Sequence, residues 1–195
     1  MDIQKESKPE EENDLVWILR GADQAVIGDF QAARRAFSRA LEMEVEEVPM
    51  DTFGLSRQAQ LVRQGLSKKA FDSGMTAYQE GRSEVSKKAF ILALQWDPRS
   101  MEAYLMLGLI LADSGDLERA EKELFSALLL NPANASAYVI LGTVYQERGN
   151  FEKAMMTYRQ ALALDSKVPS TEVYMSQIYF QQEKWDSAQV VLKRV

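Results

Sequence analysis

The sequence contains no histidine and no cysteine among its 195 residues, and only five prolines. Without these two side chains the chain cannot build the usual zinc site, a Ser-His-Asp or Cys-His nucleophile, a haem-ligating histidine or a disulfide. Glycine-rich phosphate loops of the G-x-G-x-x-G and Walker A types are also absent. We therefore expect a protein that is not an enzyme and that uses neither a metal nor a cofactor.

Long apolar runs and an excess of positive charge are missing as well. The longest nearly uncharged apolar run covers residues 103–112, whereas a bilayer-spanning helix needs about 20 residues. The formal net charge is −6 at pH 7, which argues against a nucleic-acid partner, because such binding relies on clustered lysine and arginine. The first residues lack the basic start and apolar run of a secretory signal. These absences predict a cytoplasmic protein that does not insert into membranes.

The composition is otherwise that of a folded protein, with 46% hydrophobic and 27% charged residues. That is enough apolar material for a buried core. Residues 1–13 differ, because they are dominated by acidic side chains and hold few apolar ones. Such a segment cannot bury enough surface to offset its ordering entropy, so we predict a disordered acidic tail over 1–13.

An internal repeat is the main signal in the sequence. Segments 101–134 and 135–168 align without a gap at an offset of 34 residues. The alignment pairs Tyr104 with Tyr138, Leu107 with Leu141, Gly108 with Gly142, Gly115 with Gly149, Ala120 with Ala154, Leu124 with Tyr158 and Ala127 with Ala161. The same pattern recurs in 14–47, 67–100 and 169–195. We predict one structural unit used five times, the last copy being shorter, as in a truncated repeat.

Each unit has the pattern of two amphipathic helices joined by a tight turn. Apolar residues recur at i, i+3, i+4 and i+7 in both halves. Gly115 and Gly149 fall where the first helix should end. Gly108 and Gly142 fall inside the first helix, where glycine costs about 1 kcal/mol relative to alanine. That cost predicts close approach of the second helix at these two positions.

These residues resemble the tetratricopeptide repeat signature, W-x2-L-G-x2-Y followed by A-x3-F and a proline. The resemblance covers 14–47 and 67–195 and implies an all-α solenoid, a right-handed superhelix of antiparallel helix pairs. It also implies a non-enzymatic adaptor or scaffold that binds another protein on a concave face lined by the first helices. The first repeat departs from the signature, since Arg20 replaces its leucine. Trp17 and Trp185 are interpreted as packing residues between helices.

Two segments fall outside the repeat period. For residues 48–66 we predict one of three arrangements: an inserted helical linker, a forward extension of the helix near Ser67, or an ordered helix that continues the stack. The chain ends in an apolar stretch around Leu192 with no polar capping helix. Because solenoids usually need a solvated terminal unit, we expect either a chain cut from a longer protein or an end that packs on something, a second copy included.

The resemblance also names the ligand-facing positions. They are Phe71, Met75, Tyr78, Leu105, Leu109, Asp113, Val139, Thr143, Gln146, Glu147, Val173, Gln177 and Phe180. The slots in which some relatives carry a cationic carboxylate clamp hold no basic residue and no asparagine here, so binding of an acidic C-terminal peptide in the groove is disfavoured.

An apolar strip with an acidic edge suits an amphipathic helix or extended segment that carries apolar anchors and some basic residues. The alternative for any one of these side chains is packing on the protein's own helices. At the level of function, the alternatives are a self-assembling structural scaffold and the regulatory part of a longer protein.

Overall fold

The computed structural model describes residues 14–26, 28–42, 57–168 and 170–193. The predicted tail 1–13 and residues 48–56 of the predicted linker lie outside these described residues. Within them the chain forms ten α-helices and no strand, which confirms the predicted all-α class. No helix in the described ranges combines the length and the apolarity needed to cross a membrane.

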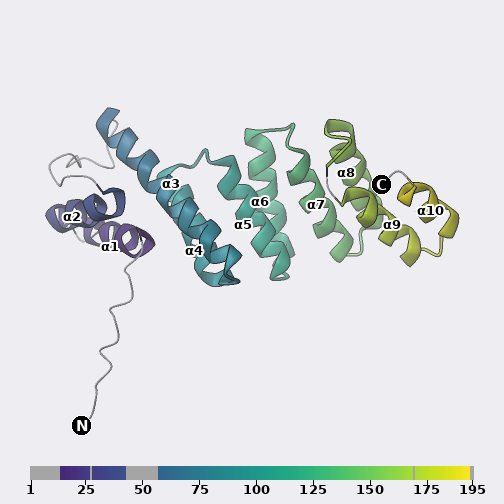
Figure 1. Ribbon diagram of the computed structural model, residues 1–195, viewed down its shortest axis with the longest axis horizontal. Coiled ribbons are helices and arrows are strands. Elements are labelled where there is room, and N and C mark those ends of the chain that lie inside the picture. The colour runs from purple at the N-terminus through teal and green to yellow at the C-terminus, as the bar shows by residue number, and fades with distance from the viewer. Residues whose placement is uncertain (1–13, 27, 43–56, 169, 194–195) are drawn as a thin grey trace, which may run out of the picture. The chain divides into compact units, whose positions relative to one another are not determined.

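The chain divides into two units, Met1–Pro98 and Arg99–Val195. The described residues of the first unit form four helices, namely α1 (Asp14–Val26), α2 (Phe30–Leu41), α3 (Arg57–Gln79) and α4 (Ser83–Trp96) (Figure 1). Helix α1 packs on α2 and α3 packs on α4, and α3 also contacts both helices of the first pair. Residues 57–66 of the predicted linker and the segment from Ser67 to Gln79 therefore form one continuous helix.

Aromatic rings close the core of the first unit. The ring of Phe37 on α2 meets Trp96 on α4 edge-on, with the ring centroids 5.3 Å apart. Leu66 and Ala70, four residues apart on α3, are both fully buried. The two helix pairs of this unit therefore share one apolar core, and α3 runs along it.

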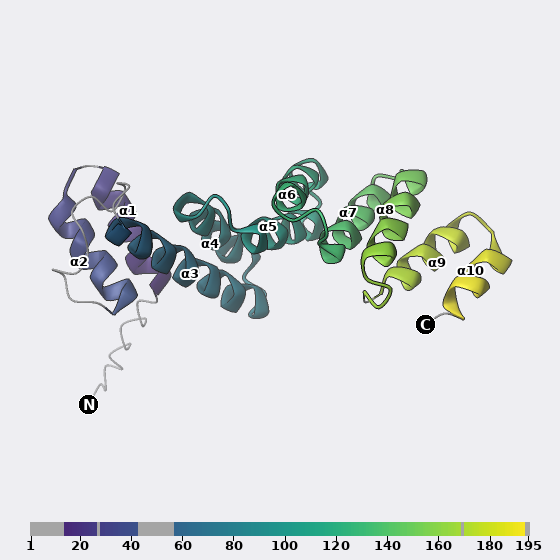
Figure 2. The ribbon, with the colours of Figure 1, turned by 90° about the horizontal axis from the view of Figure 1, so that it is seen from above.

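In the second unit, the part of the chain that the structure describes forms six helices, namely α5 (Met101–Asp113), α6 (Leu117–Leu130), α7 (Ala135–Glu147), α8 (Phe151–Leu164), α9 (Thr171–Gln181) and α10 (Trp185–Leu192) (Figure 2). Each helix packs on the next, and α7 also contacts both α5 and α9. The first helices of the three pairs thus form one layer of the unit.

Helix ends in this unit follow ordinary capping chemistry. The Asp116 side chain accepts a hydrogen bond from the Arg119 amide, and the Asn150 side chain accepts one from the Lys153 amide. Each cap satisfies one of the amide donors that a helix start leaves without a partner. Gly149 precedes Asn150 with φ of +73°, a backbone conformation that residues with a side chain rarely adopt. The turn between α7 and α8 is therefore set locally.

The glycines inside the first helices are sites of close packing, as predicted. A Cβ atom at Gly142 would lie 2.4 Å from Cε1 of Tyr158 on α8, and one at Gly108 would lie 2.8 Å from Cγ of Leu124 on α6. Tyr158 and Leu124 are both fully buried. The large side chain of the second helix therefore occupies the space that a side chain on the first helix would need.

Gly142→Ala should destabilise the protein. Overpacking of a tight core costs about 1–3 kcal/mol, and the 2.4 Å approach places Gly142 at the upper end of that range. Alanine recovers about 1 kcal/mol through its higher helix propensity, so we expect a net loss of about 2 kcal/mol. Urea unfolding followed by circular dichroism measures it. Gly65→Ala is the control, because its Cβ would meet only the flexible end of Leu41, at 3.0 Å, and a smaller loss is expected. Equal stabilities of wild type and Gly142→Ala would contradict the tight contact.

Candidate functional site

The predicted binding positions of α5 lie on one face of that helix. Leu105, Leu109 and Asp113 are spaced four residues apart, which places them one above the other. The two leucines are half-buried and Asp113 is exposed. By contrast, Leu107 and Leu111 are buried in the core. Helix α5 therefore offers part of two leucine side chains to the surface and ends on a carboxylate.

Helix α7 presents a more polar set. Val139 is half-buried, and the Thr143 hydroxyl donates to the carbonyl of Ile140 within the same helix at 2.7 Å. The side-chain oxygen of Gln146 accepts a hydrogen bond from the Tyr158 hydroxyl at 3.0 Å. Glu147, the last residue of the helix, is exposed. Packing within the unit thus holds Gln146 in place and leaves Glu147 at the surface.

Helix α9 carries the more exposed apolar residues of the set. Val173 and Phe180 are 39% and 43% exposed, and the Phe180 ring lies 5.5 Å from that of Trp185. The side-chain nitrogen Nε2 of Gln146 donates a hydrogen bond to the side-chain oxygen of Gln177 at 3.5 Å, and this bond joins α7 to α9. We call the solvent-facing side chains of these three helices the α5–α7–α9 surface; its residues are Leu105, Leu109, Asp113, Val139, Thr143, Gln146, Glu147, Val173, Gln177 and Phe180.

The other three predicted positions belong to the first unit. Phe71, Met75 and Tyr78 are all half-buried on α3. The Phe71 ring packs on Phe90 of α4, with the centroids 5.3 Å apart. Phe71 is therefore partly engaged in packing between the helices of its own pair.

The most exposed large apolar side chain of the second helices lies outside the predicted set. Leu129 on α6 is 84% exposed, and Phe125, one turn earlier, is exposed too. They line a pocket of about 720 Å³ together with Glu118, Glu121, Lys122, Ser126 and Leu128. The sequence signal was the pair of apolar residues four apart, next to the buried positions Leu124 and Leu128 of the same helix.

The C-terminal helices hold a second apolar pocket. Its volume is about 660 Å³, and it lies between α8, α9 and α10; the lining residues are Arg159, Leu162, Ala163, Met175, Tyr179, Asp186, Ser187, Val190 and Val191. Trp185, interpreted from the sequence as a packing residue, is 60% exposed at the start of α10. The apolar residues that the sequence places at this end are thus partly open to solvent.

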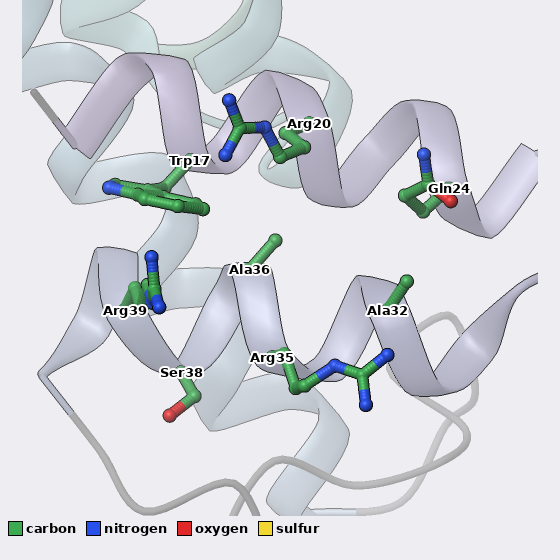
Figure 3. A pocket seen from close by; sticks show the side chains of 8 residues that line it. All are labelled: Trp17, Arg20, Gln24, Ala32, Arg35, Ala36, Ser38 and Arg39. Atoms are coloured by element: carbon green, nitrogen blue, oxygen red, sulfur yellow. The ribbon is translucent and has the colours of Figure 1, made fainter. Parts of the chain in front are cut away.

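A third pocket, of about 590 Å³, lies between α1 and α2 in the first unit (Figure 3). Three of its lining residues are arginines, and the sequence did not single it out. Arg20 in place of the signature leucine was the available signal. The spacing of Arg35 and Arg39 was a second signal, because residues four apart on a helix lie on the same face.

A hydrogen-bonded cluster joins α6 to α7 behind the α5–α7–α9 surface. The Tyr145 hydroxyl donates to a carboxylate oxygen of Glu121 at 2.8 Å, and Arg148 forms an ion pair with the same carboxylate. Burial, together with the hydrogen bond to Glu121, raises the pKa of Tyr145 to about 12. Burial also raises the pKa of Tyr158 on α8. Both phenols therefore stay protonated, and act as hydrogen-bond donors, well beyond neutral pH.

Comparison with known proteins identifies the family. Two family models described as tetratricopeptide repeat match residues 71–135 and 135–168, which together make up half of the chain. The chain belongs to the tetratricopeptide repeat family, a class of helical protein-interaction scaffolds. No curated protein matches the sequence.

Solved structures with the same fold are distant in sequence. The crystal structure of MamA superposes with a TM-score of 0.62 at 22% identity, over 89% of this chain and 91% of that one. The Arabidopsis OM64 TPR domain gives a TM-score of 0.58 at 19% identity, over 60% of this chain and 96% of that domain. The first TPR of Spaghetti (RPAP3), bound to the HSP90 peptide SRMEEVD, gives a TM-score of 0.57 at 15% identity, over 60% of this chain and 93% of that one. At these identities the likeness is one of fold.

The raised pKa of Tyr145 predicts a loss of stability at alkaline pH. The unfolded phenol ionises near pH 10 and the folded one near pH 12, so the stabilisation is fully present below about pH 10 and is lost as pH rises through the folded pKa. Tyr145→Phe should therefore lose less stability than wild type between about pH 8 and about pH 11. Urea unfolding at several pH values measures this difference, and identical declines in the two proteins would contradict it.

Proposed function

We propose that this protein is a non-enzymatic adaptor that binds an amphipathic segment of a partner protein on the α5–α7–α9 surface. The observation that carries the proposal is the partial exposure of apolar side chains on three neighbouring helices of one unit. Leu105 and Leu109 come from α5, Val139 from α7, and Val173 and Phe180 from α9. A single helix would present too narrow an apolar strip, whereas three adjacent helices offer anchors along a peptide.

The charge at this surface selects the chemistry of the partner. Asp113 and Glu147 are the exposed last residues of α5 and α7. A segment with apolar anchors and some lysine or arginine would place opposite charges near these carboxylates. The RPAP3 repeats hold an acidic peptide, but the carboxylate-clamp slots of this chain carry no cation, so we propose a ligand of the opposite charge. The affinity expected for one such segment is about micromolar, near −8 kcal/mol.

A charged side chain at the centre of the surface should abolish binding. The probe is a fluorescent helical peptide with leucines at i, i+3, i+4 and i+7 and lysines along the edges of that apolar face, followed by fluorescence anisotropy. Leu109→Glu places a carboxylate against the apolar side chains of the bound peptide. Val139→Lys places an ammonium group there, and that group also repels the lysines of the probe. Each change should weaken binding at least about tenfold, which corresponds to about 1.4 kcal/mol.

Leu129→Glu is the matched control, because it makes the same change on α6, where Leu129 is 84% exposed. It should bind the probe as wild type does. All three variants should keep the helical circular dichroism signal. If folded Leu109→Glu and Val139→Lys bind the probe with unchanged affinity, the α5–α7–α9 surface is not the binding site.

The exposed apolar residues at the C-terminal end favour a second candidate function, self-association. Trp185 is 60% exposed, Val190 and Leu192 are exposed as well, and the pocket between α8, α9 and α10 lies beside them. Exposed apolar surface of this kind is a typical contact between copies.

Val190→Glu tests self-association, because a carboxylate inside a copy-to-copy contact would lose its hydration without gaining a partner. Light scattering coupled to size exclusion measures the mass over a concentration series. We expect wild type to form dimers at the highest concentrations and Val190→Glu to remain monomeric. A wild-type monomer at every concentration would rule this candidate out.

A further inference from the structure

The pocket between α1 and α2 differs in chemistry from the surfaces described so far. Its volume is about 590 Å³, and we call it the arginine pocket; it is lined by Trp17, Arg20, Gln24, Ala32, Arg35, Ala36, Ser38 and Arg39. In Figure 3, Trp17, Arg20 and Gln24 project from α1, and the other labelled residues project from α2. Three of the eight side chains are cationic and none is acidic, in a chain whose formal net charge is −6.

Trp17 gathers two of these cations. The guanidinium carbons of Arg20 and Arg39 each lie 4.4 Å from the centroid of the Trp17 ring. Cation–π attraction at this distance holds both guanidinium groups beside the mouth of the pocket. Trp17 is half-buried and both arginines are exposed, so the ring positions their charged ends without removing them from solvent.

Helix α2 adds the third cation and an apolar floor. Arg35 and Arg39 are four residues apart, and so are Ala32 and Ala36, so each pair is stacked along α2. Figure 3 shows the methyl groups of the two alanines directed toward α1. Because alanine is small, the space between them and Gln24 stays open. The pocket therefore combines an apolar floor with a cationic rim.

We propose that the arginine pocket is a second protein-binding site, which accepts an acidic segment of a partner protein. Carboxylates of the segment pair with Arg35 and Arg39, because the planar guanidinium group matches a carboxylate with two parallel hydrogen bonds. An apolar side chain of the same segment lies over the half-buried Ala32, beside the buried Ala36.

This site and the α5–α7–α9 surface select opposite partners. The surface of the second unit offers apolar contacts and carboxylates, whereas the first unit offers apolar contacts and guanidinium groups. Two segments of opposite charge could therefore be held by one chain. The two proposals stand on different residues, and each can fail without the other.

The test uses the full chain and a fluorescent peptide that carries glutamates and one leucine per turn, measured by anisotropy. Arg35→Gln/Arg39→Gln removes two guanidinium groups from exposed positions and should weaken binding at least about tenfold. Arg35→Lys/Arg39→Lys keeps the charge but loses the paired hydrogen bonds. Its affinity for the probe should therefore lie between those of wild type and Arg35→Gln/Arg39→Gln. Arg82→Gln/Arg119→Gln is the matched control, since it removes two exposed arginines that do not line the arginine pocket, and it should bind as wild type.

A companion peptide with glutamine in place of every glutamate should bind the wild-type chain at least about tenfold more weakly than the glutamate probe. The proposal is overturned if Arg35→Gln/Arg39→Gln binds the glutamate probe as wild type does, or if the two peptides bind equally. It is also overturned if the probe binds only after Glu10, Glu11 and Glu12 are all changed to glutamine, because the chain's own acidic residues would then be the occupant. A wild-type dimer that Arg35→Gln/Arg39→Gln dissociates would assign the pocket to a second copy instead.

Discussion

The close contact between a glycine of one helix and a large side chain of the next is the constraint on which the helix pairs depend. It recurs in four pairs, Gly21 with Phe37, Gly74 with Phe90, Gly108 with Leu124 and Gly142 with Tyr158. In each, a ring or a branched side chain fills the space where a Cβ would stand. Such a contact sets the distance between the two helices and their relative rotation, because a tightly packed core has little room to adjust. The direction in which every other side chain of the pair points follows from it.

That rotation separates side chains that pack in the core from side chains that remain at the surface. On α5, Leu107 and Leu111 turn into the core, whereas Leu105 and Leu109 remain half-buried at the surface. Adjacent helices repeat the arrangement, so partly exposed apolar residues from α5, α7 and α9 share one layer. Hydrogen bonds reinforce the layer, since Tyr158 on α8 donates to Gln146 on α7 and Gln146 donates to Gln177 on α9. A peptide that binds there meets side chains that are already ordered.

The first unit uses the same helix-pair geometry for a different kind of surface. Where the family signature has a leucine, Arg20 lies over the face of Trp17 and shares the ring with Arg39. The small residues Ala32 and Ala36 then line an open space instead of a filled one. One fold thus supports an apolar surface edged by carboxylates in one unit and an arginine-lined pocket in the other. To change the chemistry of the surface, it is sufficient to exchange a few side chains at positions that do not set the distance between the helices. The fold is then left unchanged.

The helices and the family could be predicted from the sequence, because amphipathic periodicity, the 34-residue offset and the turn glycines act over short stretches of chain. The need for close packing at Gly108 and Gly142 was also predictable from the cost of glycine inside a helix. Solvent exposure and the meeting of distant side chains were not, since both depend on how the helices are rotated against one another. Trp185 contacts Phe180 of α9, as expected of a residue that packs between helices, but remains 60% exposed. Arg39 reaches Trp17 only because α2 folds back along α1. Local pattern therefore determined the elements, and tertiary packing decided which of their side chains lie at the surface.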